Sequence, residues 1–403
     1  MPISKKVSEQ IGRASWIRRM FEEGRALKAR VGEENVYDFS LGNPILEPPD
    51  EFFEALEAVA QDRSPGLHRY MTNAGFADTR LAVADKHALE SGLEYTADHV
   101  LMSVGAAGAL NVTLKTILNA GEEVILFAPF FAEYEFYIDN HGGVPKILPT
   151  DLNFDPDLDA LAAAIGPQTR AVLINTPNNP TGRVYGHSTI EGLARVLQTK
   201  QKELGTVIYL LSDEPYRSIV YEVYDVPMVA TYYDNTIICT SHSKDLGLAG
   251  ERIGHIAVSP NAADAMELVN GMAFAIRTLG FVNAPALMQR AVTHILDCTV
   301  DVDFYRRNRD TLYTELRALG FEMHKPQGAF FLFPKTPALD DIAFVRGLQK
   351  HHILTVPGSG FGTPGDIRIC SSVDRALLDR SLPVWAKAAA ELGLQPGKAG
   401  KPA

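Results

Sequence analysis

The sequence predicts an α/β protein with a large, mostly parallel sheet, followed by a smaller α+β region. Short apolar runs bounded by turn residues recur along the first two thirds of the chain, and amphipathic helical patterns separate most of them. Buried strands that alternate with helices form sheets covered on both faces. The 403 residues are enough for two or three domains. We therefore expect a three-layer large domain at about residues 50–290.

The elements of this large domain can be placed in order. The apolar runs predicted to be strands are residues 100–104, 123–127, 171–174, 207–211, 236–239 and 253–258. The helical patterns between them include residues 108–118, 157–165 and 189–204. Most strands are followed by a helix, which is the order that builds parallel sheets.

The character of the sequence changes after Pro285. Long amphipathic helices at residues 300–319 and 375–392 flank strand candidates at 329–333 and 366–370. We expect a smaller α+β domain at residues 291–396. Residues 1–49 are expected to form an N-terminal arm and a segment of that smaller domain, and residues 397–403 a flexible tail.

Composition narrows the possible partners. The net charge of −11 and the absence of a basic stripe argue against nucleic acid. No apolar run is long enough to span a membrane, and the first residues lack the apolar core of a signal peptide, so we expect a cytoplasmic protein. The three cysteines are widely spaced, which favours reduced thiols over disulfides, and no pattern indicates a metal site.

The most informative segment follows the apolar run 236–239. It reads Ser-His-Ser-Lys from Ser241 to Lys244, and Arg252 follows eight residues later. A strand end presents the lysine, and the two serines and the arginine can bind an anion together. An isolated lysine here would be an ordinary surface residue. The combination instead suggests a Schiff-base lysine beside a phosphorylated cofactor.

Further blocks stand in a fixed order around this lysine. Residues 178–182 read Asn-Asn-Pro-Thr-Gly, residues 213–216 read Asp-Glu-Pro-Tyr, and Arg368 comes last. Alone, the first would be a turn and the second a helix cap. Together with the Ser-x-Ser-Lys and Gly-Leu-Ala-Gly-x-Arg-Ile-Gly pattern they resemble the class I/II aminotransferases, over residues 38–394. The resemblance implies fold type I, with a seven-stranded, mostly parallel sheet, and the cofactor pyridoxal 5'-phosphate.

The resemblance also implies roles at the reacting centre. Lys244 would bind the cofactor as a Schiff base and then move the substrate proton. Asp213 would keep the pyridine nitrogen protonated, so that the ring acts as an electron sink. Tyr216 and Asn179 would bind its phenolic oxygen, and Phe131 would lie flat against the ring, with Phe130 as the near alternative.

Other residues would hold the phosphate and the substrate. The phosphate residues implied by the resemblance are Gly105, Ala106, Ala107, Ser241, Ser243 and Arg252, with Tyr70 reaching in from the neighbouring subunit of a homodimer. Free N–H groups at a helix start favour an anion, which supports the glycine-alanine segment. Arg368 would clamp the substrate α-carboxylate, near the backbone of Gly42.

The reaction implied is a ping-pong amino transfer between an L-amino acid and a 2-oxo acid. Aspartate or glutamate with 2-oxoglutarate are the leading substrates, and aromatic or other neutral amino acids come next. Arg277 lies near the region where some relatives bind a second carboxylate, but its spacing does not match cleanly. A β-lyase on the same scaffold remains open, and a non-catalytic regulator that binds the cofactor is the remote alternative.

Overall fold

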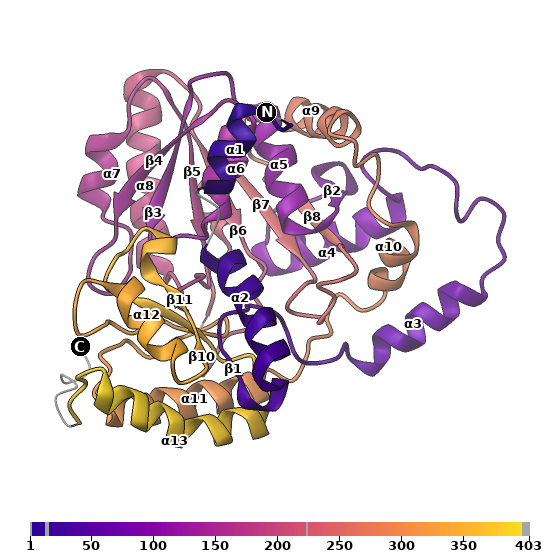
Figure 1. Cartoon of the computed structure of the whole chain (residues 1–403). Helices are drawn as coiled ribbons and strands as arrows, with labels where there is room; N and C mark the ends of the chain where they lie inside the picture. Colours follow the sequence, from indigo (N-terminus) through magenta and orange to yellow (C-terminus); the bar gives the residue numbers. More distant parts are fainter. Residues whose placement is uncertain (1, 13–15, 223–224, 397–403) are drawn as a thin grey trace.

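The computed structural model describes residues 2–12, 16–222 and 225–396, so the tail expected at 397–403 lies outside the described residues. A seven-stranded sheet forms the centre of the larger part (Figure 1). Its strands, in spatial order, are β2 (Val100–Ser103), β8 (Gly254–Val258), β7 (Thr236–Ser241), β6 (Tyr209–Asp213), β5 (Thr169–Asn175), β3 (Glu123–Ala128) and β4 (Val144–Pro149). Only β8 runs antiparallel to its neighbours. The predicted fold is thus confirmed.

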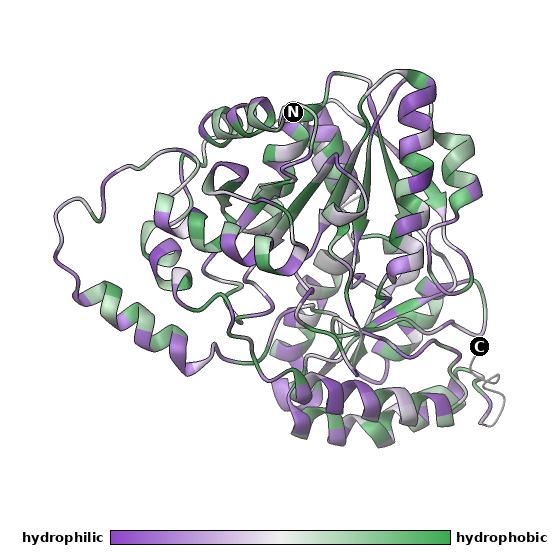
Figure 2. Cartoon of the chain, turned by 180° about the vertical axis from the view of Figure 1, so that it is seen from behind, coloured by the Kyte–Doolittle hydropathy of each residue, from purple (hydrophilic) through white to green (hydrophobic). Residues whose placement is uncertain are grey.

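The strands of the sheet, except the edge strand β4, bury side chains on both faces. In β3, Val124 and Leu126 belong to one apolar core, whereas Ile125 and Phe127 belong to another. Successive side chains of a strand point to opposite faces, so a run buried on both sides reads as continuously apolar. Figure 2 shows these green strands between helices that carry both polar and apolar residues. This explains why apolar runs located six of the seven strands, all except the edge strand β4.

Helices cover the two faces and the edge of the sheet. The helices of this part are α3 (Asp50–Gln61), α4 (Ala77–Ser91), α5 (Gly105–Ile117), α6 (Glu133–Asn140), α7 (Leu158–Ala164), α8 (His187–Leu204), α9 (Ala265–Thr278) and α10 (Ala286–Thr293). Side chains of α7 and α8 belong to the apolar core on one face of the sheet, and side chains of α5, α6 and α9 belong to the core on the other face. In Figure 1, α3 projects away from the rest beside α10.

A second core gathers the two ends of the chain. It contains α11 (Val302–Ala318), α12 (Asp341–Gln349) and α13 (Arg375–Glu391), with the antiparallel strands β11 (Val356–Pro357), β12 (Ile367–Cys370) and β9 (Phe331–Leu332). The N-terminal segment supplies α2 (Trp16–Val31) and β1 (Tyr37–Asp38), and β1 pairs in parallel with β10 (Ile353–Leu354). The first helix, α1 (Lys5–Gly12), instead contacts α6 of the larger part, because Lys6 and Gln10 both bond to Asp139. No helix among the described residues is both long and apolar enough to cross a bilayer.

Candidate active site

The candidate residues converge on one pocket of about 340 Å³ at the carboxyl ends of the central strands. This edge is where parallel α/β sheets usually bind ligands. The sequence-predicted residues that line it are Gly42, Ala106, Ala107, Phe131, Asn179, Asp213, Tyr216, Ser241, Ser243, Lys244, Arg252 and Arg368. They come from the sheet, from the N-terminal segment and from β12. The pocket therefore lies where the two cores meet.

Lys244 follows the end of β7 and reaches across to the N-terminal segment. Its Nζ donates a hydrogen bond to the carbonyl oxygen of Gly42 at 2.6 Å. The amine also lies 5.5 Å from the ring centre of Phe330 and 5.9 Å from that of Tyr216. Burial is the main cause that lowers the pKa of Lys244 to about 8. A larger neutral fraction makes this amine a better nucleophile and base than a surface lysine.

Asp213 ends β6 and is only 5% exposed. Its Oδ2 accepts a hydrogen bond from the hydroxyl of Tyr134, whereas its Oδ1 is buried and has no hydrogen-bond partner among the described residues. Burial raises the pKa of Asp213 to about 7, against the opposing effect of the Tyr134 hydrogen bond. A buried acceptor without a partner is costly, so this oxygen is prepared for a donor that enters the pocket.

Tyr134 and Asn175 are site residues that sequence reasoning missed. Tyr134 lies at the start of α6 and is 1% exposed. Asn175 ends β5, donates to the carbonyl oxygen of Asp213 at 2.8 Å, and accepts from the backbone N–H of Asn179 at 2.7 Å. The pairing of β5 with β6 brings Asn175 next to Asp213. The sequence offered one weak signal for these roles: Asn175 lies at the end of an apolar run, and Tyr134 lies shortly after one.

Arg368 is fully enclosed at the pocket wall, with 2% of its surface exposed. It lies between the rings of Phe331 and Phe361, at 4.6 and 4.9 Å from their centres. Its Nη1 donates to Asn179 Oδ1 at 3.0 Å and its Nη2 to the carbonyl oxygen of Ser40 at 2.7 Å. Its Nε is buried without a hydrogen bond to any described residue. A planar cation whose donors meet only neutral oxygens suits a carboxylate ligand.

A group of small residues and hydroxyls lies at the other end of the pocket. Ser241 and Ser243 are buried, and their hydroxyl oxygens are 3.1 Å apart. Gly105 begins α5 with a φ of +77°, and a Cβ there would lie 2.7 Å from Arg252 Nη2. Glycine therefore keeps the guanidinium next to the start of α5. Free N–H groups and a cation together favour a phosphate.

Two aromatic candidates separate clearly. Phe131 lines the pocket and packs edge-on against Tyr134, with ring centres 5.4 Å apart. Phe130 is 5% exposed and belongs to the apolar core. The geometry therefore puts Phe131 beside the ligand space and Phe130 behind it.

Tyr70 and Arg277 are not brought to the pocket within this chain. Tyr70 is 90% exposed and lies by Phe281 and Asn283 on the surface. Arg277 is exposed on α9 and lies over the ring of Phe274 at 5.3 Å. Among the described residues, no three histidine, cysteine or acidic side chains are grouped in a way that could hold a metal ion.

Comparison with known proteins agrees with this arrangement. The sequence profile described as aminotransferase class I and II matches residues 34–383. A probable aspartate/prephenate aminotransferase of Thermus aquaticus is 30% identical over 90% of this chain and 94% of its own length. A probable aspartate aminotransferase of Methanocaldococcus jannaschii is 29% identical over 81% of this chain and 86% of its own.

Solved structures extend the likeness to the whole fold. An amino transferase from Eubacterium rectale superposes with a TM-score of 0.93 at 38% identity and covers 97% of this chain and 99% of its own. The Thermus thermophilus aspartate aminotransferase, solved with maleate, gives a TM-score of 0.85 at 27% identity, with 96% and 99% covered. The sequence profile and the fold together show that the chain belongs to the class I and II aminotransferases.

Proposed function

We propose that this chain moves the amino group of an L-amino acid to a 2-oxo acid, using pyridoxal 5'-phosphate bound at the pocket around Lys244. The observation that carries the proposal is the convergence of a lysine, a buried acid and a buried arginine from distant segments on one pocket. Relatives named aspartate aminotransferase support aspartate and glutamate, with 2-oxoglutarate as acceptor, as the first substrates to test.

The residues present fit this cofactor. The buried Asp213 Oδ1 without a partner offers an acceptor for a protonated ring nitrogen. Arg252, the two serine hydroxyls and the start of α5 offer donors for a phosphate. Lys244 lines the same pocket, and burial lowers its pKa, so that its amine is more easily deprotonated than that of a surface lysine. When bound, the cofactor supplies an electron sink that lets the substrate Cα lose its proton.

The chain's own groups then account for the remaining steps. Arg368 binds the α-carboxylate through two parallel hydrogen bonds, giving up its contacts to Asn179 or Ser40 as it does so. This clamp fixes the Cα near the Lys244 amine. Lys244 takes the proton from Cα and returns it to a neighbouring atom, because its lowered pKa suits both transfers near neutral pH. The Tyr134 hydrogen bond favours the charged form of Asp213 and so opposes the effect of burial.

The first experiment mixes the purified holoenzyme with L-aspartate and no oxo acid. We expect one equivalent of oxo acid per site and then no further product until 2-oxoglutarate is added. Continued release of ammonia without an acceptor would instead identify a lyase. Bound cofactor without any product from a panel of amino acids would identify a non-catalytic binder.

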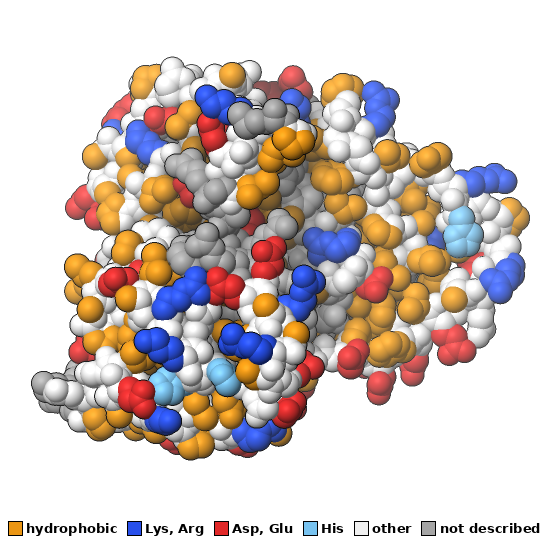
Figure 3. Space-filling view, in the orientation of Figure 1, with side chains coloured by type: hydrophobic (Ala, Val, Ile, Leu, Met, Phe, Trp, Pro, Cys, Tyr) orange, Lys and Arg blue, Asp and Glu red, His pale blue; other side chains and the backbone are white. Residues whose placement is uncertain are grey.

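The proposal includes a homodimer with shared sites. Figure 3 shows apolar side chains gathered around α10 and toward α3. Phe53 on α3 and Leu81 on α4 are each 49% exposed, and Tyr70 is 90% exposed. Exposed apolar patches commonly mark interfaces. We infer that this surface meets a second copy and that Tyr70 reaches the phosphate region of the partner's pocket.

Domain limits and location complete the proposal. The two cores support a large domain at residues 50–290 and a small domain at 291–396. The pairing of β1 with β10 supports residues 1–49 as an N-terminal arm and a segment of the small domain. A cytoplasmic location is consistent with the three free cysteines.

A further inference from the structure

The turn that follows β6 forms a wall between two spaces. Asp213 and Tyr216 line the candidate active site. Glu214 and Arg217 instead line a second cavity, of about 740 Å³, on the other side of the turn. Pro215 lines both spaces. The roles assigned above use only the side that carries Asp213 and Tyr216.

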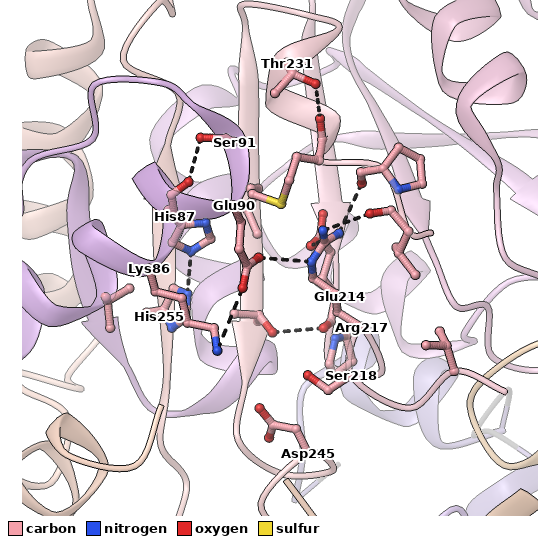
Figure 4. A pocket seen from close by; sticks show the side chains of 18 of the residues that line it. Lys86, His87, Glu90, Ser91, Glu214, Arg217, Ser218, Thr231, Asp245 and His255 are labelled. Atoms are coloured by element: carbon pink, nitrogen blue, oxygen red, sulfur yellow. Dashed lines mark hydrogen bonds and ion pairs between the residues drawn. The ribbon is translucent and has the colours of Figure 1, made fainter. Parts of the chain in front are cut away.

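Arg217 makes its contacts on the cavity side of this turn. Its Nη2 donates to the carbonyl oxygen of Val226 at 2.9 Å, and its Nη1 donates to that of Pro227 at 3.1 Å. Its Nη1 also lies 3.5 Å from Glu214 Oε2, and its Nε lies 3.6 Å from Glu90 Oε2 on α4. Figure 4 shows the guanidinium of Arg217 joined to Glu90. One planar cation thus ties the turn to residues nine and ten positions further along the chain and to α4.

Glu214 is the firmly held partner of this arginine. It is 3% exposed, and its Oε1 accepts from the hydroxyl of Ser212 at 2.6 Å. Its backbone N–H donates to the carbonyl oxygen of Cys239 at 2.9 Å, and its carbonyl oxygen accepts from Thr240 Oγ1 at 3.0 Å. Glu214 is therefore anchored to β6 and β7. Arg217 is the only side chain among the described residues that forms an ion pair with it, and a buried carboxylate without such a partner is costly.

On the active-site side, the same turn is held mainly by packing. The Asp213 carboxylate accepts a hydrogen bond from Tyr134. The ring centre of Tyr216 lies 5.4 Å from that of Phe330 and 5.7 Å from that of Phe331. Apolar contacts are not directional, so they fix the orientation of a turn less sharply than hydrogen bonds do. The positions of Asp213 and Tyr216 therefore depend on the bonds made behind them.

Small displacements of these two side chains matter for the reaction. Catalytic groups must be held within about 0.5 Å of the productive geometry, and a shift of about 1 Å can cost about 100-fold in rate. We propose that Arg217 is a positioning residue of the active site, which holds the turn so that Asp213 and Tyr216 meet the cofactor ring. The inference rests on the proposed function, because that function assigns the ring to this pocket. Arg217 itself lies outside the pocket and acts through the turn.

The test compares the Arg217→Met holoenzyme with the wild type. Methionine is also long and unbranched but donates no hydrogen bond. We expect the cofactor Kd to rise about ten-fold or more. The visible circular dichroism of the bound cofactor, which reports a fixed ring orientation, should weaken. In amino transfer, kcat should fall about ten-fold or more while KM for the amino donor changes less than about three-fold, because Arg368 is not part of the turn.

Arg80→Met is the matched control. Arg80 on α4 also donates to two backbone carbonyl oxygens, those of Val100 and Ala97, and to Asp98. It does not line the active-site pocket. Its loss should lower the thermal midpoint while the cofactor Kd and the circular dichroism stay as in the wild type. Equal losses of cofactor affinity in both variants, or wild-type affinity and dichroism in Arg217→Met, overturn the proposal.

A double variant separates position from charge. Arg217→Met leaves the buried Glu214 without its ion pair, which can destabilise the fold. Adding Glu214→Gln removes that charge, so we expect the thermal midpoint to recover. Cofactor affinity and dichroism should remain impaired, because the bonds to Val226 and Pro227 are still missing. Recovery of wild-type affinity and dichroism would show that Arg217 only neutralises Glu214, and would refute its positioning role.

The measurements of cofactor affinity and dichroism do not depend on turnover. If the wild type binds the cofactor but does not transfer amino groups, the proposed function fails, and affinity and dichroism still decide the role of Arg217. If the wild type does not bind the cofactor, both proposals fail.

Discussion

At the scale of single residues, Asp213 has the most unusual environment in the active site. Its carboxylate is buried, one oxygen is held by Tyr134 and the other has no partner among the described residues. In the free protein this arrangement disfavours the charged form, yet a cofactor with a protonated ring nitrogen needs that form. A cationic ring that binds beside Asp213 would therefore reduce the free-energy cost of burying its charged form.

This environment predicts that the stability of the folded apoenzyme depends on pH through Asp213. The folded pKa of Asp213 is about 7 and the ordinary value is 3.8, so the folded state binds the proton more tightly between these values. Stability from this group is therefore present below about pH 4 and is lost as the pH rises to about 7. Each pKa difference of one corresponds to about 1.4 kcal/mol. As the pH rises from 5 to 8, the free energy of unfolding of Asp213→Asn should therefore increase by about 2–3 kcal/mol relative to that of the wild type.

Urea unfolding of the two apoenzymes at pH 5 and pH 8 measures this gain. Asp85→Asn, at an exposed position of α4, is the control and should follow the wild type. A stability difference between Asp213→Asn and wild type that does not grow with pH would contradict the assigned pKa. The same variant should retain the cofactor but transfer amino groups far more slowly, because it offers the ring nitrogen no anion.

The Tyr134 hydroxyl gives a second prediction at this scale. Its hydrogen bond to Asp213 opposes the effect of burial, so Tyr134→Phe should raise the pKa of Asp213 further. Hydrogen bonds to charged groups contribute about 1.5–3 kcal/mol, which corresponds to a loss of about 10- to 100-fold in kcat/KM. The acidic limb of the pH–rate profile should also shift to higher pH. A lower rate with an unmoved limb would show that the tyrosine acts only through packing.

At the scale of elements, the start of α5 depends on a glycine. Gly105→Ala places a Cβ 2.7 Å from Arg252 Nη2 and adds backbone strain at a φ of +77°. The guanidinium must then move away from the region expected to bind phosphate. We expect cofactor affinity to fall by about ten-fold or more, as one charge-assisted contact is lost.

A matched glycine separates the two effects of this change. Gly121 has a φ of +88°, and a Cβ there would have no atom within 4 Å. Gly121→Ala should therefore lower the thermal midpoint through strain but leave cofactor affinity unchanged. Equal loss of affinity in both variants, measured by absorbance titration of the apoenzymes, would show that backbone strain and not Arg252 is responsible.

The elements also show what could be predicted from the sequence. Strands buried on both faces, such as 171–174, are continuous apolar runs and were found. Strand β4 was missed because Val144–Pro149 contains two prolines and lies partly exposed at the sheet edge. The pairing of β1 with β10 joins Tyr37 to Ile353, which no local pattern indicates.

The candidate site divides in the same way. Lys244 and Arg368 carry residue types and spacings that resemble a known pattern, and they do line one pocket. Tyr134 and Asn175 have no such signal, because their roles come from contacts of a helix and a strand with Asp213, which is far away in the sequence.

At the scale of the whole molecule, the pocket is assembled from distant parts of the chain. Gly42 accepts from Lys244 across 202 positions of sequence, and Arg368 donates to Ser40 across 328. The two cores must therefore hold a fixed relation for the site to exist. In contrast, Tyr70 is largely exposed and absent from its own chain's pocket. A second copy is the natural place for it to act.

Shared sites predict recovery of activity in mixed dimers. Lys244→Ala lacks the reacting amine, and Tyr70→Phe lacks the hydroxyl expected to bind the partner's phosphate, so each homodimer should be inactive or strongly impaired. A mixed dimer has one pocket with Lys244 from one subunit and Tyr70 from the other, which is intact. We expect this dimer, purified with two different tags, to recover up to half of the wild-type rate per dimer. Refolded mixtures of Lys244→Ala with itself control for contamination. If proven mixed dimers only equal the average of the two parents, Tyr70 serves its own subunit or no site at all, and the exposed surface around α3 requires another partner.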